Sequence, residues 1–310
     1  MISFSPPSSP SVSVMTRSSE PIGDAGRYLL YKGTNMVWAW LNVRTKNNED
    51  DAFLDNLDGG SDVLRAVRRN EIKRLKKFVA RSPDALETTG HMGRRPLHIA
   101  VENANAEMVT FLIDAGADEN GTRERNDTPL FWAPNAKIAE ILIKAGADLH
   151  ATDFSGREPI HWAAQFGRPD VIALLLDHGC DVNIGDDNGH TPLHWATGAC
   201  GFIHICDMTD PKSLDCVELL IERGADVNAR GTDGNVPLHG VAVMPEMDQR
   251  LIDGTLKFPP EIPDTIISIV RLLLQRGADP SVTNNDGVSP LSMSDDRMRA
   301  EMGAFSKKSK

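Results

Sequence analysis

The sequence predicts an all-α solenoid, in which similar helix–turn–helix units stack side by side. Two features recur in fixed register and support this prediction. A Gly-Ala-Asp or Gly-Cys-Asp tripeptide begins at five positions, which are Gly116, Gly146, Gly179, Gly224 and Gly277. A proline follows each of these glycines after 13 residues, whereas the distance from that proline to the next glycine varies. Repetition of this kind is typical of solenoid proteins.

An inner helix is predicted to begin at the proline of each unit, because proline in the first helical turn loses no hydrogen bond. These prolines are Pro96, Pro129, Pro159, Pro192, Pro237 and Pro290. Thr128, Thr191 and Ser289 precede three of them and are expected to cap their helices. Weaker caps are expected where the preceding residue is Arg95, Glu158 or Val236.

A second, more apolar helix is predicted between each proline and the next glycine, for example over residues 171–176. The glycine then suits a left-handed position just after the helix. The constant stretch that follows carries turn-forming residues, such as Asp-Asp-Asn-Gly at 186–189. A single pair of this kind cannot bury its own apolar face, so the units are expected to stack.

Residues 1–57 are predicted to form a mostly disordered extension. The first 19 residues hold eight serines, one base (Arg17) and no acid, which indicates disorder, with an organellar transit peptide as the alternative. Residues 27–43 contain both tyrosines and two of the five tryptophans, and suggest a short hairpin that either packs on the following domain or recruits a partner. An acidic linker follows.

Residues 58–303 are predicted to be the repeat domain, with five full units between a degenerate first unit and a truncated last one, and residues 304–310 a basic tail. The Pro129 unit is three residues short, so its inner helix is expected to end early. Two insertions, 199–210 and 244–263, are predicted to be neighbouring loops. Eight bases and two acids lie between positions 62 and 81. This patch is either a solvated cap or a site for nuclear import or phospholipid binding.

Residues 187–196 (Asp-Asn-Gly-His-Thr-Pro-Leu-His-Trp-Ala) and 219–228 (Leu-Leu-Ile-Glu-Arg-Gly-Ala-Asp-Val-Asn) resemble the two halves of the ankyrin repeat. The resemblance covers about residues 58–300. It implies a protein-binding scaffold without a cofactor, and a structural role for the histidine two residues after four of the prolines (His98, His161, His194 and His239). It also implies that Asn183 and Asn228 match positions modified by asparaginyl hydroxylases, although the same asparagine serves turn geometry.

Composition narrows the class of partner and compartment. Acids outnumber bases by 44 to 33, which argues against a nucleic-acid binder, because neutralising phosphates supplies most of that affinity. Four cysteines in 310 residues favour a reducing compartment, and no apolar run is long enough to span a bilayer. We therefore expect a monomer in the cytoplasm or nucleus that binds another protein.

Catalytic motifs are not recognisable, so we expect no enzyme. One cluster with zinc-ligand chemistry lies in or near the first insertion, and consists of Cys200, His204, Cys206 and Cys216. Its spacing matches no known zinc finger, and we expect no metal. A zinc-binding or catalytic role for the two insertions remains an alternative function, as does a substrate adaptor of a ubiquitin ligase.

The candidate binding surface centres on tryptophans in equivalent positions of three consecutive units. Trp132, Trp162 and Trp195 each stand three residues after the proline. The resemblance implies that they lie at or just beneath the concave face, either contacting a partner or packing between units. Turn-tip residues complete the predicted surface, and these are Arg125, Phe154, Arg157, Asp187 and His190. Tryptophan and arginine are frequent hot-spot residues of protein interfaces.

Overall fold

The computed structural model describes residues 61–198, 211–242, 264–294 and 296–306. Every regular element in these residues is helical, which confirms the all-α prediction. The N-terminal extension, the hairpin predicted at 27–43 and both insertions lie outside the described residues. So do Cys200, His204 and Cys206.

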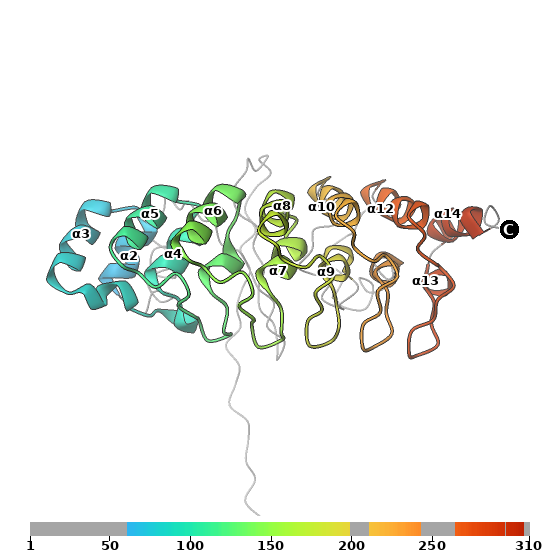
Figure 1. The fold of residues 1–310 in the computed structure, drawn as a ribbon, viewed down its shortest axis with the longest axis horizontal. Coiled ribbons are helices and arrows are strands. Elements are labelled where there is room, and N and C mark those ends of the chain that lie inside the picture. The colour runs from blue at the N-terminus through green and yellow to red at the C-terminus, as the bar shows by residue number, and fades with distance from the viewer. Residues whose placement is uncertain (1–60, 199–210, 243–263, 295, 307–310) are drawn as a thin grey trace, which may run out of the picture. The chain divides into compact units, whose positions relative to one another are not determined.

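The helices alternate between an inner and an outer layer, and neighbouring pairs stand side by side in a row (Figure 1). The inner elements are α2 (Asp62–Arg68), α4 (Pro96–Glu102), η3 (Pro129–Trp132), α7 (Pro159–Gln165), α9 (Pro192–Thr197), the helical residues 237–242 and α13 (Pro290–Met293). The outer elements are α3 (Ile72–Arg81), α5 (Ala106–Asp114), α6 (Ala136–Ala145), α8 (Pro169–Asp177), α10 (Pro211–Glu222), α12 (Asp264–Gln275) and α14 (Asp296–Ser306). Two short 3₁₀ turns, η1 (Pro83–Glu87) and η2 (His91–Gly93), join α3 to α4.

The outer helices bury the same three positions in every full unit, four, seven and eight residues before the glycine. At the position four residues before it, all five leucines are completely buried: Leu112, Leu142, Leu175, Leu220 and Leu273. Spacings of three and four residues place these side chains on one helical face. Each outer helix therefore packs this face into the stack, and α14 closes the far end with the buried Met298 and Met302 against α12.

The five glycines after the outer helices adopt the left-handed conformation that the register predicts, with φ between 93° and 109°. The short Pro129 unit also behaves as predicted. Its inner element η3 is a single 3₁₀ turn, and Asn135 starts α6 by accepting the Ile138 N–H at 3.1 Å. Sequence register alone thus defines the ends of these helices.

The predicted caps of the inner helices are only partly correct. Ser289 accepts the N–H of Ser292 at 3.2 Å, as expected. Thr128 makes no capping hydrogen bond, and its buried hydroxyl has no partner among the described residues. The reason is that the N–H of Phe131 already donates to the Thr128 carbonyl at 3.2 Å within the 3₁₀ turn. In four other units a histidine occupies the third helical position and accepts the N–H of the residue that precedes the helix.

These histidines are His98, His161, His194 and His239. Each ring accepts, at Nδ1, the N–H of the residue before the proline, over 3.0–3.4 Å. Because Nδ1 accepts, Nε2 carries the hydrogen and donates to a carbonyl of the following unit, over 3.0–3.4 Å. The expected structural role of the histidines is confirmed. Each one links its unit to the next by a hydrogen bond, whatever residue precedes the proline.

A second set of bridges joins the ends of the outer helices. Asn120, Asn183 and Asn228 each donate to the carbonyl of the next unit's C-terminal glycine and accept the N–H of the aspartate two residues later, over 2.8–3.1 Å. Both ends of each amide are therefore engaged between units. The side chains of Asn183 and Asn228 thus have a structural role between units, and their modification remains a prediction.

Candidate protein-interaction surface

The turns that precede the inner helices extend from one edge of the stack and are joined by a ladder of backbone hydrogen bonds (Figure 1). The N–H five residues before each proline donates to the carbonyl four residues before the previous proline, over 2.7–3.2 Å. The five donors are Glu124, Phe154, Asp187, Thr232 and Asn285. This turn-tip ladder fixes the backbone of six consecutive tips, although it forms no regular strand.

The tip of the Pro159 unit carries the most prominent apolar side chain. Phe154 is 74% exposed, and no other large hydrophobic side chain among the described residues is exposed. Its N–H donates to the carbonyl of Arg125 at 3.1 Å, so the two residues are neighbours across the ladder. Arg125 is half-buried and Asp187, on the next tip, is exposed. Three of the predicted surface residues therefore lie on adjacent tips.

Asp153 fixes the backbone of the turn that carries Phe154. One carboxylate oxygen accepts the N–H groups of Ser155 and Arg157 at 2.9 and 3.1 Å. The other accepts Arg157 Nε at 2.8 Å and the indole N–H of Trp162 at 3.1 Å. Phe154 thus projects from a turn whose backbone is fixed on both sides.

The three tryptophans are buried, with 3–4% of each residue exposed. Each indole N–H donates to an aspartate of its own unit: Trp132 to Asp127, Trp162 to Asp153 and Trp195 to Asp186. The three indoles therefore lie beneath the surface, and Trp132 packs against Trp162 of the next unit. A large flat ring with one polar atom is well placed beneath a surface when a carboxylate accepts its N–H.

Arginines cover the indoles from the tip side. The Arg157 guanidinium lies 4.5 Å from the Trp162 ring and 4.9 Å from the Trp195 ring, and Arg123 lies 4.1 Å from the Trp132 ring. Both arginines form buried ion pairs, with Asp153 and Asp127 respectively. Arg157 is 8% exposed. It belongs to the support of the surface, because its charge is paired with Asp153 and its guanidinium plane contacts the Trp162 and Trp195 rings.

His190 is likewise buried at the equivalent position of the Pro192 unit. Its Nε2 lies 3.3 Å from Asp233 of the following tip, and its Nδ1 lies 3.9 Å from Asp186. The predicted surface therefore divides into an outer set (Arg125, Phe154 and Asp187) and a buried support that includes the tryptophans, Arg157 and His190. Sequence register could not separate the two sets.

Two other predicted features fall within the described residues. Cys216 is completely buried on α10 and belongs to no group of three potential metal ligands among the described residues. The basic patch on α2 and α3 exposes several of its side chains, and Arg74 contacts Asp62 and Glu71. Sequence reasoning missed a third feature, the convergence of His150, Glu158 and Cys180. The sequence does contain a signal for it, because all three residues depart from the repeat pattern.

Stacked helix pairs joined by a turn-tip ladder define a repeat-solenoid class of protein. Family comparisons assign the repeat. A model of three ankyrin repeats matches residues 63–153 and 135–231, and a model of a single ankyrin repeat matches residues 233–285. The chain belongs to the ankyrin-repeat family.

Individual relatives agree with this assignment. The chain is 37% identical over 67 residues to the ankyrin repeat protein FPV230 of fowlpox virus (strain NVSL), a match that spans 22% of this chain and 34% of the viral protein. The chain thus covers about a third of that relative. No helix among the described residues is long and apolar enough to cross a membrane.

Solved structures show the same fold at lower identity. The ankyrin repeat domain of Bcl-3, a member of the IkappaB protein family, is 23% identical, with a TM-score of 0.56 over 80% of this chain and 99% of that domain. The human ASB11 ankyrin repeat domain is 21% identical, with a TM-score of 0.60 over 79% of this chain and 97% of that domain. Ankyrin-repeat domains are in general non-catalytic modules for protein–protein interaction.

Proposed function

We propose that this chain is a scaffold that binds a partner protein through the turn tips of the Pro129, Pro159 and Pro192 units and the adjoining inner face. The observation that carries the proposal is Phe154, an aromatic side chain that is 74% exposed on a tip fixed by the backbone ladder and by Asp153. A rigid aromatic anchor loses little conformational entropy on binding, which favours affinity.

The chemistry of the tips indicates the kind of partner surface. Phe154 calls for an apolar pocket, and Arg125 beside it favours an acidic group at the rim of that pocket. Asp187 on the next tip favours a basic group. This arrangement of opposite charges about an apolar centre fixes the register of a complex more than it adds affinity. The proposal includes a monomeric chain acting in the cytoplasm or nucleus. The low cysteine content of the chain supports a reducing compartment of this kind.

The test compares two substitutions at the same position of the tip ladder. Phe154→Ala removes the anchor, and Thr232→Ala alters an exposed tip two units away. Proteins enriched by the full-length chain in proximity labelling are expected to include a partner that Phe154→Ala loses by roughly tenfold or more and Thr232→Ala retains. Equal recovery of every partner by the two variants would show that the Phe154 tip is not the binding site.

A further inference from the structure

Three departures from the repeat pattern meet at one junction between units. His150 replaces the asparagine that bridges neighbouring units at the equivalent position of three other units. Glu158 replaces the threonine or serine that precedes the proline in three units, and Cys180 replaces the alanine of Gly-Ala-Asp. Each change exchanges a structural residue for one whose side chain can bind a metal ion.

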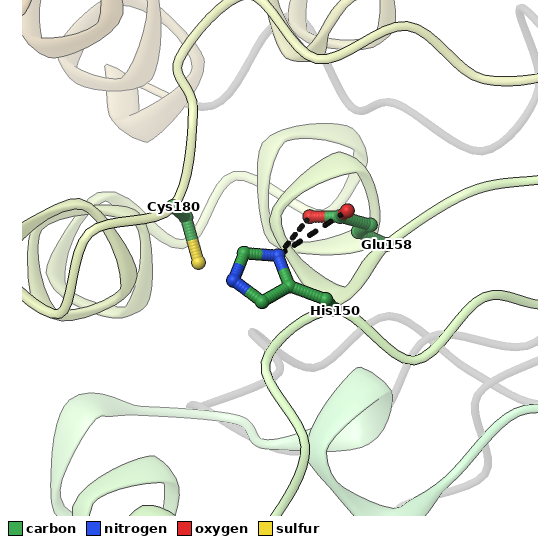
Figure 2. A group of neighbouring side chains, drawn as sticks. All are labelled: His150, Glu158 and Cys180. Carbon is green, nitrogen blue, oxygen red and sulfur yellow. Dashed lines mark hydrogen bonds and ion pairs between the residues drawn. The ribbon is translucent and has the colours of Figure 1, made fainter.

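The fold brings these side chains together from three elements. His150 lies in the turn after α6, Glu158 immediately precedes α7, and Cys180 follows the glycine that ends α8. Figure 2 shows the imidazole between the other two side chains, with the Cys180 sulfur pointing toward the ring. His150 Nδ1 lies 3.4 and 3.3 Å from the two Glu158 oxygens. One ligand atom from each residue lies within 4.8 Å of the others.

The surroundings favour a cation at this position. The Glu158 side chain is 9% exposed, and its ion-pair partner His150 is charged only when protonated. Burial raises the pKa of the Glu158 carboxyl. Burial, with the nearby Glu158 charge, also raises the pKa of the Cys180 thiol to about 11. Two groups that become anions on deprotonation are thus held together in a poorly solvated site, where a dication would compensate both.

We propose that His150, Glu158 and Cys180 form a binding site for a transition-metal dication, with Zn²⁺ as the preferred ion. Nitrogen, oxygen and sulfur together are a ligand set that suits Zn²⁺, whereas Mg²⁺ and Ca²⁺ favour oxygen alone. Zinc bonds of about 2.0–2.3 Å require the three ligand atoms to close in by roughly 1 Å. His150 provides that adjustment, because its side chain is 59% exposed and its ring can turn.

This site differs from the sequence-predicted cluster near the first insertion, and it has a second consequence for the fold. A metal ion held by His150 and Cys180 would join the Pro129 and Pro159 units where the asparagine bridge is missing. The ion would therefore replace, at this one junction, the contact that Asn120, Asn183 and Asn228 make elsewhere.

The experiment uses the full-length chain and substitutions copied from its own repeats. His150→Asn, Glu158→Thr and Cys180→Ala each install the residue that other units carry at the same position. Thermal melting in the presence of a chelator checks that each variant folds. Zn²⁺ binding is measured by competition with a chromophoric chelator, and Co²⁺ is used as a spectroscopic probe for thiolate coordination. Cys200→Ser with Cys206→Ser is the matched control.

We expect the natural chain to bind one Zn²⁺ and to give a thiolate-to-Co²⁺ charge-transfer band in the near ultraviolet. Cys180→Ala is expected to abolish the band. Cys180→Ala and His150→Asn are each expected to weaken Zn²⁺ binding by about 100-fold or more. The Cys200 and Cys206 double variant is expected to keep both signals. The proposal is overturned if the natural chain gives no thiolate band, or if the band survives Cys180→Ala and disappears in the double variant.

Discussion

At the scale of single residues, the tryptophans show how one polar atom decides where an aromatic side chain lies. Each of the three indoles is buried and donates its N–H to an aspartate, and two of these aspartates, Asp153 and Asp186, also accept backbone N–H groups of their own turns. Asp153 connects these functions, because it binds Trp162 and fixes the turn that carries Phe154. The buried indole and the exposed phenyl ring are therefore parts of one local structure.

Replacing Trp162 with alanine is expected to lower the free energy of unfolding by about 3–5 kcal/mol, because it leaves a cavity and removes a donor from Asp153. Phe154→Ala provides the control, and is expected to change stability by less than about 0.5 kcal/mol. Chemical denaturation measures both. A partner found through Phe154 should bind the folded fraction of the Trp162 variant normally. Weakened binding without loss of stability would instead place Trp162 in the interface.

At the scale of the element, the inner helices depend on histidines that must stay neutral. Protonation of Nδ1 would remove the acceptor for the N–H before the proline. Burial accordingly lowers the pKa of all four rings, and lowers that of His194 to about 4. At a solution pH between the folded pKa of His194 and its ordinary pKa of 6.5, the unfolded chain binds more protons than the folded chain. Stability is therefore complete above pH 6.5 and falls as the solution becomes more acidic.

We expect the free energy of unfolding to decrease between pH 7 and pH 5, by up to about 1.4 kcal/mol per pH unit for each buried histidine. His194 alone would then account for about 3 kcal/mol between neutral pH and its folded pKa. Denaturant titrations across this range measure the slope. His194→Gln should make the slope shallower, whereas substitution of the exposed His91 with Gln should not. An identical slope in both variants would contradict the histidine mechanism.

At the scale of the repeat domain, stability is shared, because neighbouring described units are bound by packing, by the turn-tip ladder and, at most junctions, by histidine and asparagine bridges. The histidine bridges, the asparagine bridges and the turn-tip ladder all cross between units. A unit that unfolds leaves the faces and donors of both neighbours uncovered. Solenoids of this kind couple their units through such interfaces.

The tryptophan fluorescence of the Pro129, Pro159 and Pro192 units should therefore change together with the helical circular dichroism of the whole domain. The measurement requires Trp38→Phe and Trp40→Phe, so that fluorescence reports only on the three buried indoles. Leu175→Ala, in the middle of the stack, is expected to shift both denaturation midpoints equally. Separate midpoints for fluorescence and circular dichroism would show that the units unfold independently.

The register of glycine and proline by itself predicted the all-α repeat solenoid and the ends of most of its helices. These residues act on the backbone locally: proline begins a helix, and the glycine after α8, Gly179, accepts a positive φ of 93°. The sequence also determined that the Pro129 unit ends its inner helix early. The same local reasoning failed at Thr128, because the N–H of Phe131, which its hydroxyl was expected to accept, donates to the Thr128 carbonyl in a 3₁₀ turn.

Only the tertiary structure decided which predicted site residues reach the surface. Phe154 and Arg157 are three residues apart in one turn, yet the first is exposed and the second is buried between two indoles. It also decided that His150, Glu158 and Cys180 meet. The physical reason is common to both cases. Whether a side chain is exposed, and which side chains meet, depends on the next unit in the stack. The residues of that unit are about 30 or more positions away in the sequence, so the local sequence does not reveal which of them cover or approach a given side chain.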